Sequence, residues 1–225
     1  MSDVLVRAED LVRVYGTGPR AVRAVWEATF SIEPGERIAL VGPSGSGKST
    51  LLLLIAGLET PTSGTLAWPA FGESGDLRPG PITIAFQGPS LLPPLNVGEN
   101  VALPLLLEGR TQTEAAAAAR AALDLFELGD VAEKLPEEIS GGQAQRAGLA
   151  RAIVGEPRLV LADEPTGQLD HETAGRAIHA LLEAADVSGA AIVVATHDPA
   201  VAETMDAWWR IEAGELRAEV SRCSA

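Results

Sequence analysis

Several features that define common protein classes are scarce in this chain of 225 residues. It has a single cysteine, Cys223, so no disulfide can form within it. Its apolar runs, such as residues 51–56, are far shorter than the roughly 20 residues that a membrane-spanning helix needs. No charged segment leads into an apolar one, as it would in a secretion signal. We therefore expect a cytoplasmic domain that folds without disulfides and does not insert into a membrane by itself.

Positive charge is also scarce. The chain has 17 Lys and Arg residues against 31 Asp and Glu residues, which gives a formal net charge of −14. Nucleic acids bind basic surfaces and anionic lipids repel acidic ones, so we expect no nucleic-acid partner and no direct contact with lipid. The acidic surface has two interpretations: it keeps a cytosolic protein soluble, or it receives the basic cytoplasmic loops of a membrane protein. Charge alone does not decide between them.

A glycine-rich loop, GPSGSGKST, occupies residues 42–50. It matches the pattern G-x-x-x-x-G-K-[ST], in which backbone N–H groups turn inward around phosphates and the following helix offers its positive N-terminal end. Lys48, one of only two lysines, would place a compact ammonium at the outer phosphates, and the Ser49 hydroxyl would bind Mg²⁺. The sequence therefore predicts a site for a nucleoside triphosphate with Mg²⁺. The candidate residues of this loop are Gly42, Pro43, Ser44, Gly45, Ser46, Gly47, Lys48, Ser49 and Thr50.

Apolar patterning around the loop indicates an α/β fold. A short strand precedes Gly42, and residues 49–56 are typical of a helix that ends at Gly57. Strand-like segments at the start of the chain are broken by glycine and proline, which predicts an antiparallel β region there. Later runs are short and almost entirely apolar, as in buried strands of a parallel sheet. The predicted strands are residues 4–14, 24–32, 36–41, 82–86, 159–162 and 191–195.

The middle of the chain has the character of helices. Thr111 and Glu114 form a T-x-x-E capping box before an alanine-rich run that we expect to continue to Leu128 and stop at Gly129. A second helix should begin after Ser140. We therefore expect a single P-loop NTPase domain, with a mixed sheet core and an inserted α-helical subdomain. Its predicted parts are the whole domain (1–225), the nucleotide-binding core (1–87 and 157–225), the helical subdomain (88–156) and a poorly ordered loop (72–80).

An apolar strand ends in two adjacent carboxylates, Asp163 and Glu164. Such a strand delivers acids to Mg²⁺ at the carboxyl edge of a parallel sheet. Because side chains alternate along a strand, we expect the two to point in different directions. Asp163 is then the candidate for holding the metal, directly or through its waters, and Glu164 for polarising the attacking water. A solvated acidic turn is the alternative for an isolated pair, and the nucleotide loop upstream makes it less favoured.

Residues 139–143, Ile-Ser-Gly-Gly-Gln, resemble the LSGGQ signature of ATP-binding cassette ATPases. The segment also predicts an open helix N-terminus with free N–H groups, which is a second anion site. The resemblance implies that the nucleotide is ATP. It also implies a homodimer, in which the signature of one copy closes over the ATP held by the loop of the other. The signature candidates are Ser140, Gly141, Gly142 and Gln143.

Other residues match motifs of the same family, and their roles are those that the resemblance implies. Gln87 resembles the glutamine that senses Mg²⁺ and water and couples to the transport subunit, and residues 167–170 resemble the D-loop. His197 resembles the switch histidine that contacts the γ-phosphate. Tyr15, the only tyrosine, stands where the family places an aromatic that stacks on adenine, with a half-buried strand residue as the alternative. The catalytic candidates are Lys48, Gln87, Glu164 and His197, and the candidate metal ligands are Ser49, Gln87 and Asp163.

Three segments, at residues 91–93, 99–104 and 162–170, resemble the lipoprotein-release, macrolide-efflux and FtsE-like branch of this family. The resemblance implies an ATP-hydrolysing subunit on the cytoplasmic face of the cell membrane, which drives conformational change in an integral membrane permease of FtsX or MacB type. The alternative is an FtsE-like regulatory ATPase that signals through a membrane partner to a cell-wall hydrolase without transport. Both alternatives use the same catalytic residues.

Overall fold

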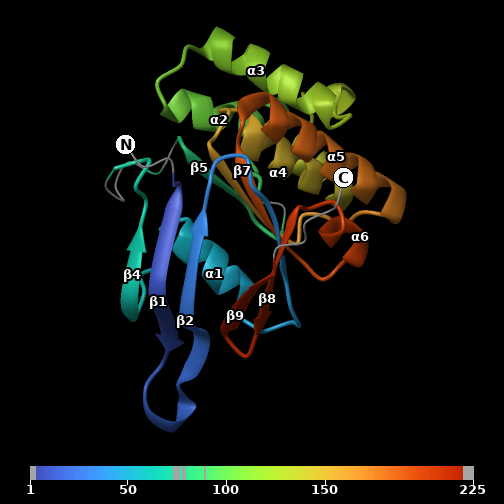
Figure 1. The fold of residues 1–225 in the computed structure, drawn as a ribbon. Helices are drawn as coiled ribbons and strands as arrows, with labels where there is room; N and C mark the ends of the chain where they lie inside the picture. The colour runs from blue at the N-terminus through green and yellow to red at the C-terminus, as the bar shows by residue number, and fades with distance from the viewer. Residues whose placement is uncertain (1–3, 73–76, 78–79, 89, 220–225) are drawn as a thin grey trace.

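The computed structural model describes residues 4–72, 77, 80–88 and 90–219. In this part of the chain the strands form one mixed sheet of nine, in the order β4-β1-β2-β9-β8-β3-β7-β6-β5. Helices cover the sheet, and Figure 1 shows α2 and α3 at the end of the molecule opposite to the β8–β9 hairpin. Most of the predicted loop 72–80 falls outside the described residues.

An antiparallel arm lies at one edge of the sheet (Figure 1). β1 (Val6–Tyr15) pairs antiparallel with both β2 (Val22–Ile32) and β4 (Ser63–Ala67). β9 (Glu215–Glu219) joins the arm to the rest of the sheet, because it pairs parallel with β2 and antiparallel with β8 (Ala207–Glu212). The antiparallel β region expected at the start of the chain is confirmed.

Four strands that lie next to candidate residues other than Tyr15 pair in parallel. They are β3 (Arg37–Val41), β5 (Ile82–Ala85), β6 (Leu159–Asp163) and β7 (Ala191–Thr196). All residues of β6 and β7 are buried, since helices pack on one face of the sheet and α1 with the antiparallel arm on the other. The carboxyl ends of β3, β6 and β7 therefore meet at the same edge.

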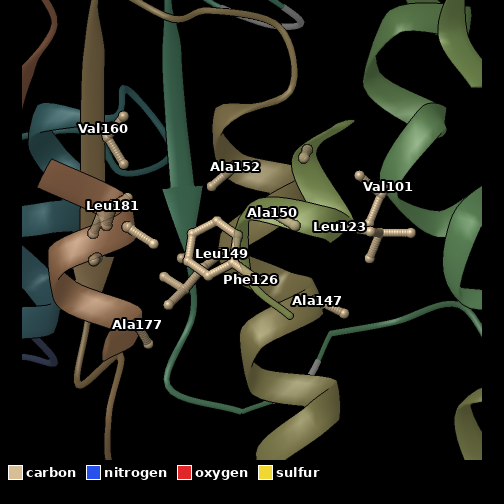
Figure 2. Close-up of a cluster of buried hydrophobic side chains, with 14 of the residues drawn as sticks. Val101, Leu123, Phe126, Ala147, Leu149, Ala150, Ala152, Val160, Ala177 and Leu181 are labelled. Carbon is tan, nitrogen blue, oxygen red and sulfur yellow. The ribbon is translucent and has the colours of Figure 1, made fainter. Parts of the chain in front are cut away.

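Two hydrophobic clusters lie on the two faces of this sheet. Along β6, Val160 belongs to the cluster formed with the helices, whereas Leu161 belongs to the cluster formed with α1 (Lys48–Ile55) and the arm. Figure 2 shows part of the first cluster, to which Phe126 and Leu149 both belong. Phe126 is 2% exposed, and complete burial of such a side chain contributes about 2–3 kcal/mol to folding. Side chains that alternate along β6 thus belong to clusters on opposite faces of the sheet.

Helices α2 (Val97–Leu107), α3 (Gln112–Leu125) and α4 (Gly141–Ile153) follow one another between β5 and β6. The remaining α-helices of the described residues are α5 (His171–Ser188) and the short α6 (Pro199–Ala202). No helix in the described ranges is long and apolar enough to cross a membrane. The division into a core and a helical subdomain at 88–156 agrees with this order of elements and stays a prediction.

The end of α3 differs from the expectation. The capping box is present at its start, because the Thr111 hydroxyl accepts from the Glu114 N–H at 3.3 Å and the Glu114 carboxylate accepts from the Thr111 N–H at 3.0 Å. The helix nevertheless ends at Leu125 and does not continue to Leu128. Glu127 has a left-handed backbone with φ 56°, and the Leu128 N–H donates to the Leu123 carbonyl at 2.8 Å, which is a Schellman turn. Leu128, which follows this turn, is fully buried.

Candidate active site

The glycine-rich loop leaves β3 at Val41 and enters α1 at Lys48. Its path is fixed by close packing against two distant strands. A Cβ atom at Gly42 would lie 2.2 Å from the Ile211 carbonyl oxygen, and one at Gly47 would lie 1.9 Å from the Ala24 carbonyl oxygen. Gly47 also has φ +112°, a backbone conformation that residues with a Cβ rarely adopt. Glycine at these two positions is therefore required by the fold itself.

Backbone donors of the loop converge on one cavity. Helical hydrogen bonding in α1 begins at Leu51, whose N–H donates to the Gly47 carbonyl at 2.9 Å. Among the described residues, no protein group accepts from the N–H groups of five cavity-lining loop residues, namely Gly45, Gly47, Lys48, Ser49 and Thr50. Unpaired N–H groups at a helix N-terminus are a site for a phosphate. The loop therefore fits the phosphates of a nucleotide.

Lys48 is held at the mouth of this loop. Its ammonium donates to the carbonyl oxygens of Gly42 at 2.8 Å and Pro43 at 3.2 Å, and it lies 3.9 Å from one carboxylate oxygen of Glu164. The residue is 8% exposed. An ammonium in this position can donate to phosphate oxygens in place of the two carbonyl oxygens.

β6 ends at Asp163, and both Asp163 and the following Glu164 line the same cavity. Glu164 has φ 49°, so the chain leaves the strand geometry at this residue. Its N–H still donates to the Ala195 carbonyl of β7 at 2.9 Å. A left-handed backbone costs a residue with a Cβ about 1–2 kcal/mol, and such strain is common where function fixes a side chain.

Glu164 and His197 form a pair across the ends of β6 and β7. Nδ1 of His197 lies 2.8 Å from the carboxylate oxygen Oε2 of Glu164. The side chain of Glu164 is 12% exposed, whereas that of His197 is 75% exposed. The histidine ring can therefore contact a ligand in the cavity while it holds a nearly buried carboxylate.

A cavity of about 620 Å³ unites most of the predicted site residues. Its lining comprises Tyr15, Val22, Ala24, Ser44, Gly45, Gly47, Lys48, Ser49, Thr50, Gln87, Asp163, Glu164 and His197. Ser49 and Asp163 both face it, and oxygen ligands of this kind suit Mg²⁺. Within the described residues, no side chain forms an ion pair with Asp163, so its carboxylate has capacity for a cation.

Three residues of the predicted loop do not line this cavity. Gly42 and Pro43 supply the carbonyl oxygens that hold Lys48, and Ser46 is 6% exposed, with its N–H donating to the Pro43 carbonyl at 3.2 Å. Val22 and Ala24 line the cavity beside Tyr15 and were not predicted from the sequence.

Tyr15 is fixed at the wall of the cavity by two side chains that the sequence did not reveal. Its hydroxyl donates to Glu59 at 3.0 Å, and the Arg13 guanidinium lies 4.5 Å from the centre of its ring. Arg13 and Glu59 form a salt bridge of 2.9 Å. The Thr60 N–H, followed by the Tyr15 hydroxyl and Arg13, lowers the pKa of the Glu59 carboxyl. Since Glu59 lies 44 residues away from Tyr15, no local sequence signal indicates this contact.

The signature residues lie elsewhere. The Ser140 hydroxyl accepts from the Gln143 N–H at 3.1 Å, and the Gln143 side chain accepts from the Ser140 N–H at 2.9 Å, so the pair caps α4. A Cβ at Gly141 would lie 2.6 Å from the side-chain oxygen of Gln168, and one at Gly142 would lie 3.1 Å from Leu169. None of these four signature residues lines the cavity of 620 Å³. The N-terminus of α4 is therefore a separate surface of the same chain.

Sequence comparison decides the family. The chain matches the ABC transporter family over residues 25–167. The chain belongs to this family. As an ABC ATPase it is 39% identical over 222 residues to the lipoprotein-releasing system ATP-binding protein LolD of Chromohalobacter salexigens, covering 96% of this chain and 94% of that protein. It is 40% identical over 219 residues to LolD of Bordetella pertussis, covering 94% of this chain and 95% of that protein.

Comparison with solved structures agrees that the chain belongs to the ABC transporter family. The chain superposes on the dimeric ATP-binding cassette MJ0796, in a post-hydrolysis state bound to ADP and Pi, with a TM-score of 0.89 and 32% sequence identity. The match covers 98% of this chain and 100% of that one. The predicted family and the mixed α/β fold class are confirmed, and the chain is an ATPase subunit of this family.

Proposed function

We propose that the protein is the ATP-hydrolysing subunit of a membrane complex of the lipoprotein-releasing type. The observation that carries the proposal is the convergence of Lys48, Asp163, Glu164 and His197 on the cavity that the phosphate loop opens into. The identity of about 40% with LolD proteins over nearly the whole chain supports the type of complex.

ATP would bind with its phosphates on the free N–H groups of the loop. Lys48 would then exchange its contacts with the Gly42 and Pro43 carbonyls for phosphate oxygens. Magnesium, held by Ser49, Asp163 and Gln87, would supply charge neutralisation at the phosphates. Tyr15, whose ring lines the cavity and is contacted by Arg13, would stack on adenine.

Glu164 would orient and polarise the attacking water. Its carboxylate is nearly buried, and the residue lines the cavity, where its backbone has φ 49°. His197 would hold that carboxylate through the 2.8 Å contact and reach the γ-phosphate with the rest of its exposed ring. Catalysis of this kind is mostly positioning and charge neutralisation.

The signature surface at Ser140 supports a homodimer. Because Ser140, Gly141, Gly142 and Gln143 lie outside the chain's own cavity, they would serve the ATP held by a second copy. The solved cassette MJ0796 is described as dimeric, which agrees with this arrangement. ATP binding would therefore join two copies, and hydrolysis would release them.

The partner that receives this motion would be an integral membrane permease, which would hold the ATPase at the cytoplasmic face of the membrane. The support is the similarity to LolD, the ATP-binding protein of a lipoprotein-releasing system. An FtsX-like or MacB-like permease is the expected kind. In this reading the acidic surface of the chain would meet basic cytoplasmic loops of the permease.

The test is reconstitution of the protein in proteoliposomes with the membrane protein that co-purifies from native membranes. We expect ATP-dependent release of a lipid-anchored protein from the bilayer, abolished by Glu164→Gln. ATP hydrolysis without release, but with ATP-dependent activation of a cell-wall hydrolase, would overturn lipoprotein release in favour of FtsE-like signalling.

A further inference from the structure

Gln145 is a buried amide between the signature helix and the catalytic strand. It lies on α4 and is 4% exposed. Its Nε2 donates to the Glu164 carbonyl oxygen at 2.9 Å, and its Oε1 accepts from the Gln168 N–H at 2.8 Å. One side chain thus uses both ends of its amide to join α4 to two backbone positions of the segment that follows β6.

The first of these contacts bears on the direction of the Glu164 carboxylate. Glu164 has φ 49°, and a strained backbone of this kind persists only where its surroundings fix it. Two further hydrogen bonds hold this turn, from the Glu164 N–H to Ala195 and from the Gly167 N–H to the Glu164 carbonyl at 3.2 Å. Gln145 is the side chain that completes this set, because it donates to the same carbonyl from a different element.

The second contact bears on the signature helix. The side chain of Gln168 lies close to Gly141 at the start of α4, since a Cβ at Gly141 would lie 2.6 Å from its side-chain oxygen. The first turn of α4 therefore packs directly against the residue whose N–H Gln145 holds. A displacement of α4 relative to the segment after β6 would therefore strain the hydrogen bonds that Gln145 makes with Glu164 and Gln168.

We propose that Gln145 is a positioning residue for hydrolysis: it holds Glu164 in the geometry that polarises water and ties that geometry to the position of α4. The proposal rests on the proposed ATPase function of this site. Gln145 does not line the cavity, so it acts through the Glu164 backbone and does not touch the nucleotide.

The test compares Gln145→Met, Gln145→Glu and the control Leu149→Ala, which removes a buried side chain one turn further along α4. Gln145→Met lacks both amide contacts, whereas Gln145→Glu keeps the acceptor for Gln168 and loses the donor to Glu164. We expect both to lower kcat by about tenfold or more with KM for ATP unchanged within about twofold. Leu149→Ala should lower the melting temperature and leave kcat close to that of the parent protein.

A double-mutant cycle separates positioning from general destabilisation. If Gln145 acts through Glu164, Gln145→Met should change the residual turnover of Glu164→Gln by less than about twofold. ATP-dependent dimerisation of the double variant should match that of Glu164→Gln alone. An equal fold-loss in both backgrounds, or a Gln145→Glu variant with parental kcat, would overturn the proposal. A parent protein without ATP turnover would instead overturn the proposed function itself.

Discussion

Nδ1 of His197 and Oε2 of Glu164 lie 2.8 Å apart, at the ends of two neighbouring parallel strands. The contact joins an exposed ring to a nearly buried carboxylate. It also places Glu164 between His197 and Lys48, whose ammonium lies 3.9 Å from the other carboxylate oxygen. The proposed chemistry depends on this arrangement.

Glu164→Gln should remove most turnover without loss of ATP binding. The amide keeps the shape of the carboxylate and loses its capacity to accept a proton, so we expect kcat to fall by about 100-fold or more. The dissociation constant for ATP should stay within about twofold of the parent value in an equilibrium titration. Turnover near the parent level would contradict Glu164 as the residue that polarises water.

Lys48→Ala should weaken binding itself. Hydrogen bonds from a charged donor contribute about 1.5–3 kcal/mol each, so the dissociation constant for ATP should rise by about tenfold or more. Lys48→Arg is the matched variant, and we expect it to restore binding only in part, because the planar guanidinium does not fit the carbonyls of Gly42 and Pro43 as the ammonium does. Calorimetric titration measures the dissociation constant for ATP of each variant. Parental affinity in Lys48→Ala would contradict the placement of the phosphates.

Arg13→Ala and Tyr15→Ala should weaken the binding of ATP but not that of tripolyphosphate. Tyr15 would stack on the base, and stacking of a base on an aromatic ring contributes about 1–3 kcal/mol. Arg13 holds that ring from behind. Arg158→Ala is the control, because Arg158 makes a similar contact with Phe71, 5.1 Å from the ring centre, away from the cavity. Equal losses for both ligands would assign Tyr15 a purely structural role.

Thr111→Ala should lower the free energy of unfolding by about 1 kcal/mol, because it removes the N-cap of α3. The Thr111 hydroxyl, followed by the Thr111 N–H, lowers the pKa of Glu114 in the folded protein. A carboxyl with a lowered folded pKa stabilises the fold above its unfolded pKa of about 4.3, and this contribution is lost as the pH falls below that value and through the lowered folded pKa. Denaturant titrations at pH 7 and at acid pH should therefore show a smaller difference between variant and parent at acid pH. An unchanged difference would contradict the link between Glu114 and the cap.

Local patterns predict much of this fold and site. The loop of residues 42–50, the buried strands, the capping box at Thr111 and the helix start after Ser140 each depend on neighbours a few residues away, and the structure has all of them. The end of α3 was missed because the left-handed turn at Glu127 is stabilised by burial of Leu128, which no local pattern at a glutamate indicates.

The unpredicted parts of the site depend on contacts between distant segments. The sequence predicts Gly42 as a residue of the phosphate-binding loop. The structure adds that a larger residue at this position would collide with the Ile211 carbonyl oxygen, far along the chain. Glu59 behind Tyr15 is likewise distant in sequence. Gln145 carried a weak signal, because it is a polar residue on the buried face of α4 together with Ala144 and Ala147, but its partners could not be named before the fold was known.

The most direct test of the central claim, that two copies share each ATP, is the molecular mass of Glu164→Gln measured by light scattering. We expect the 23.4 kDa chain to double in mass with ATP and Mg²⁺ and to stay single with ADP. Adding Ser140→Arg should prevent the doubling without loss of ATP binding, since the arginine obstructs the N-terminus of α4. A single-chain mass at saturating ATP, or a dimer that tolerates Ser140→Arg, would contradict the account.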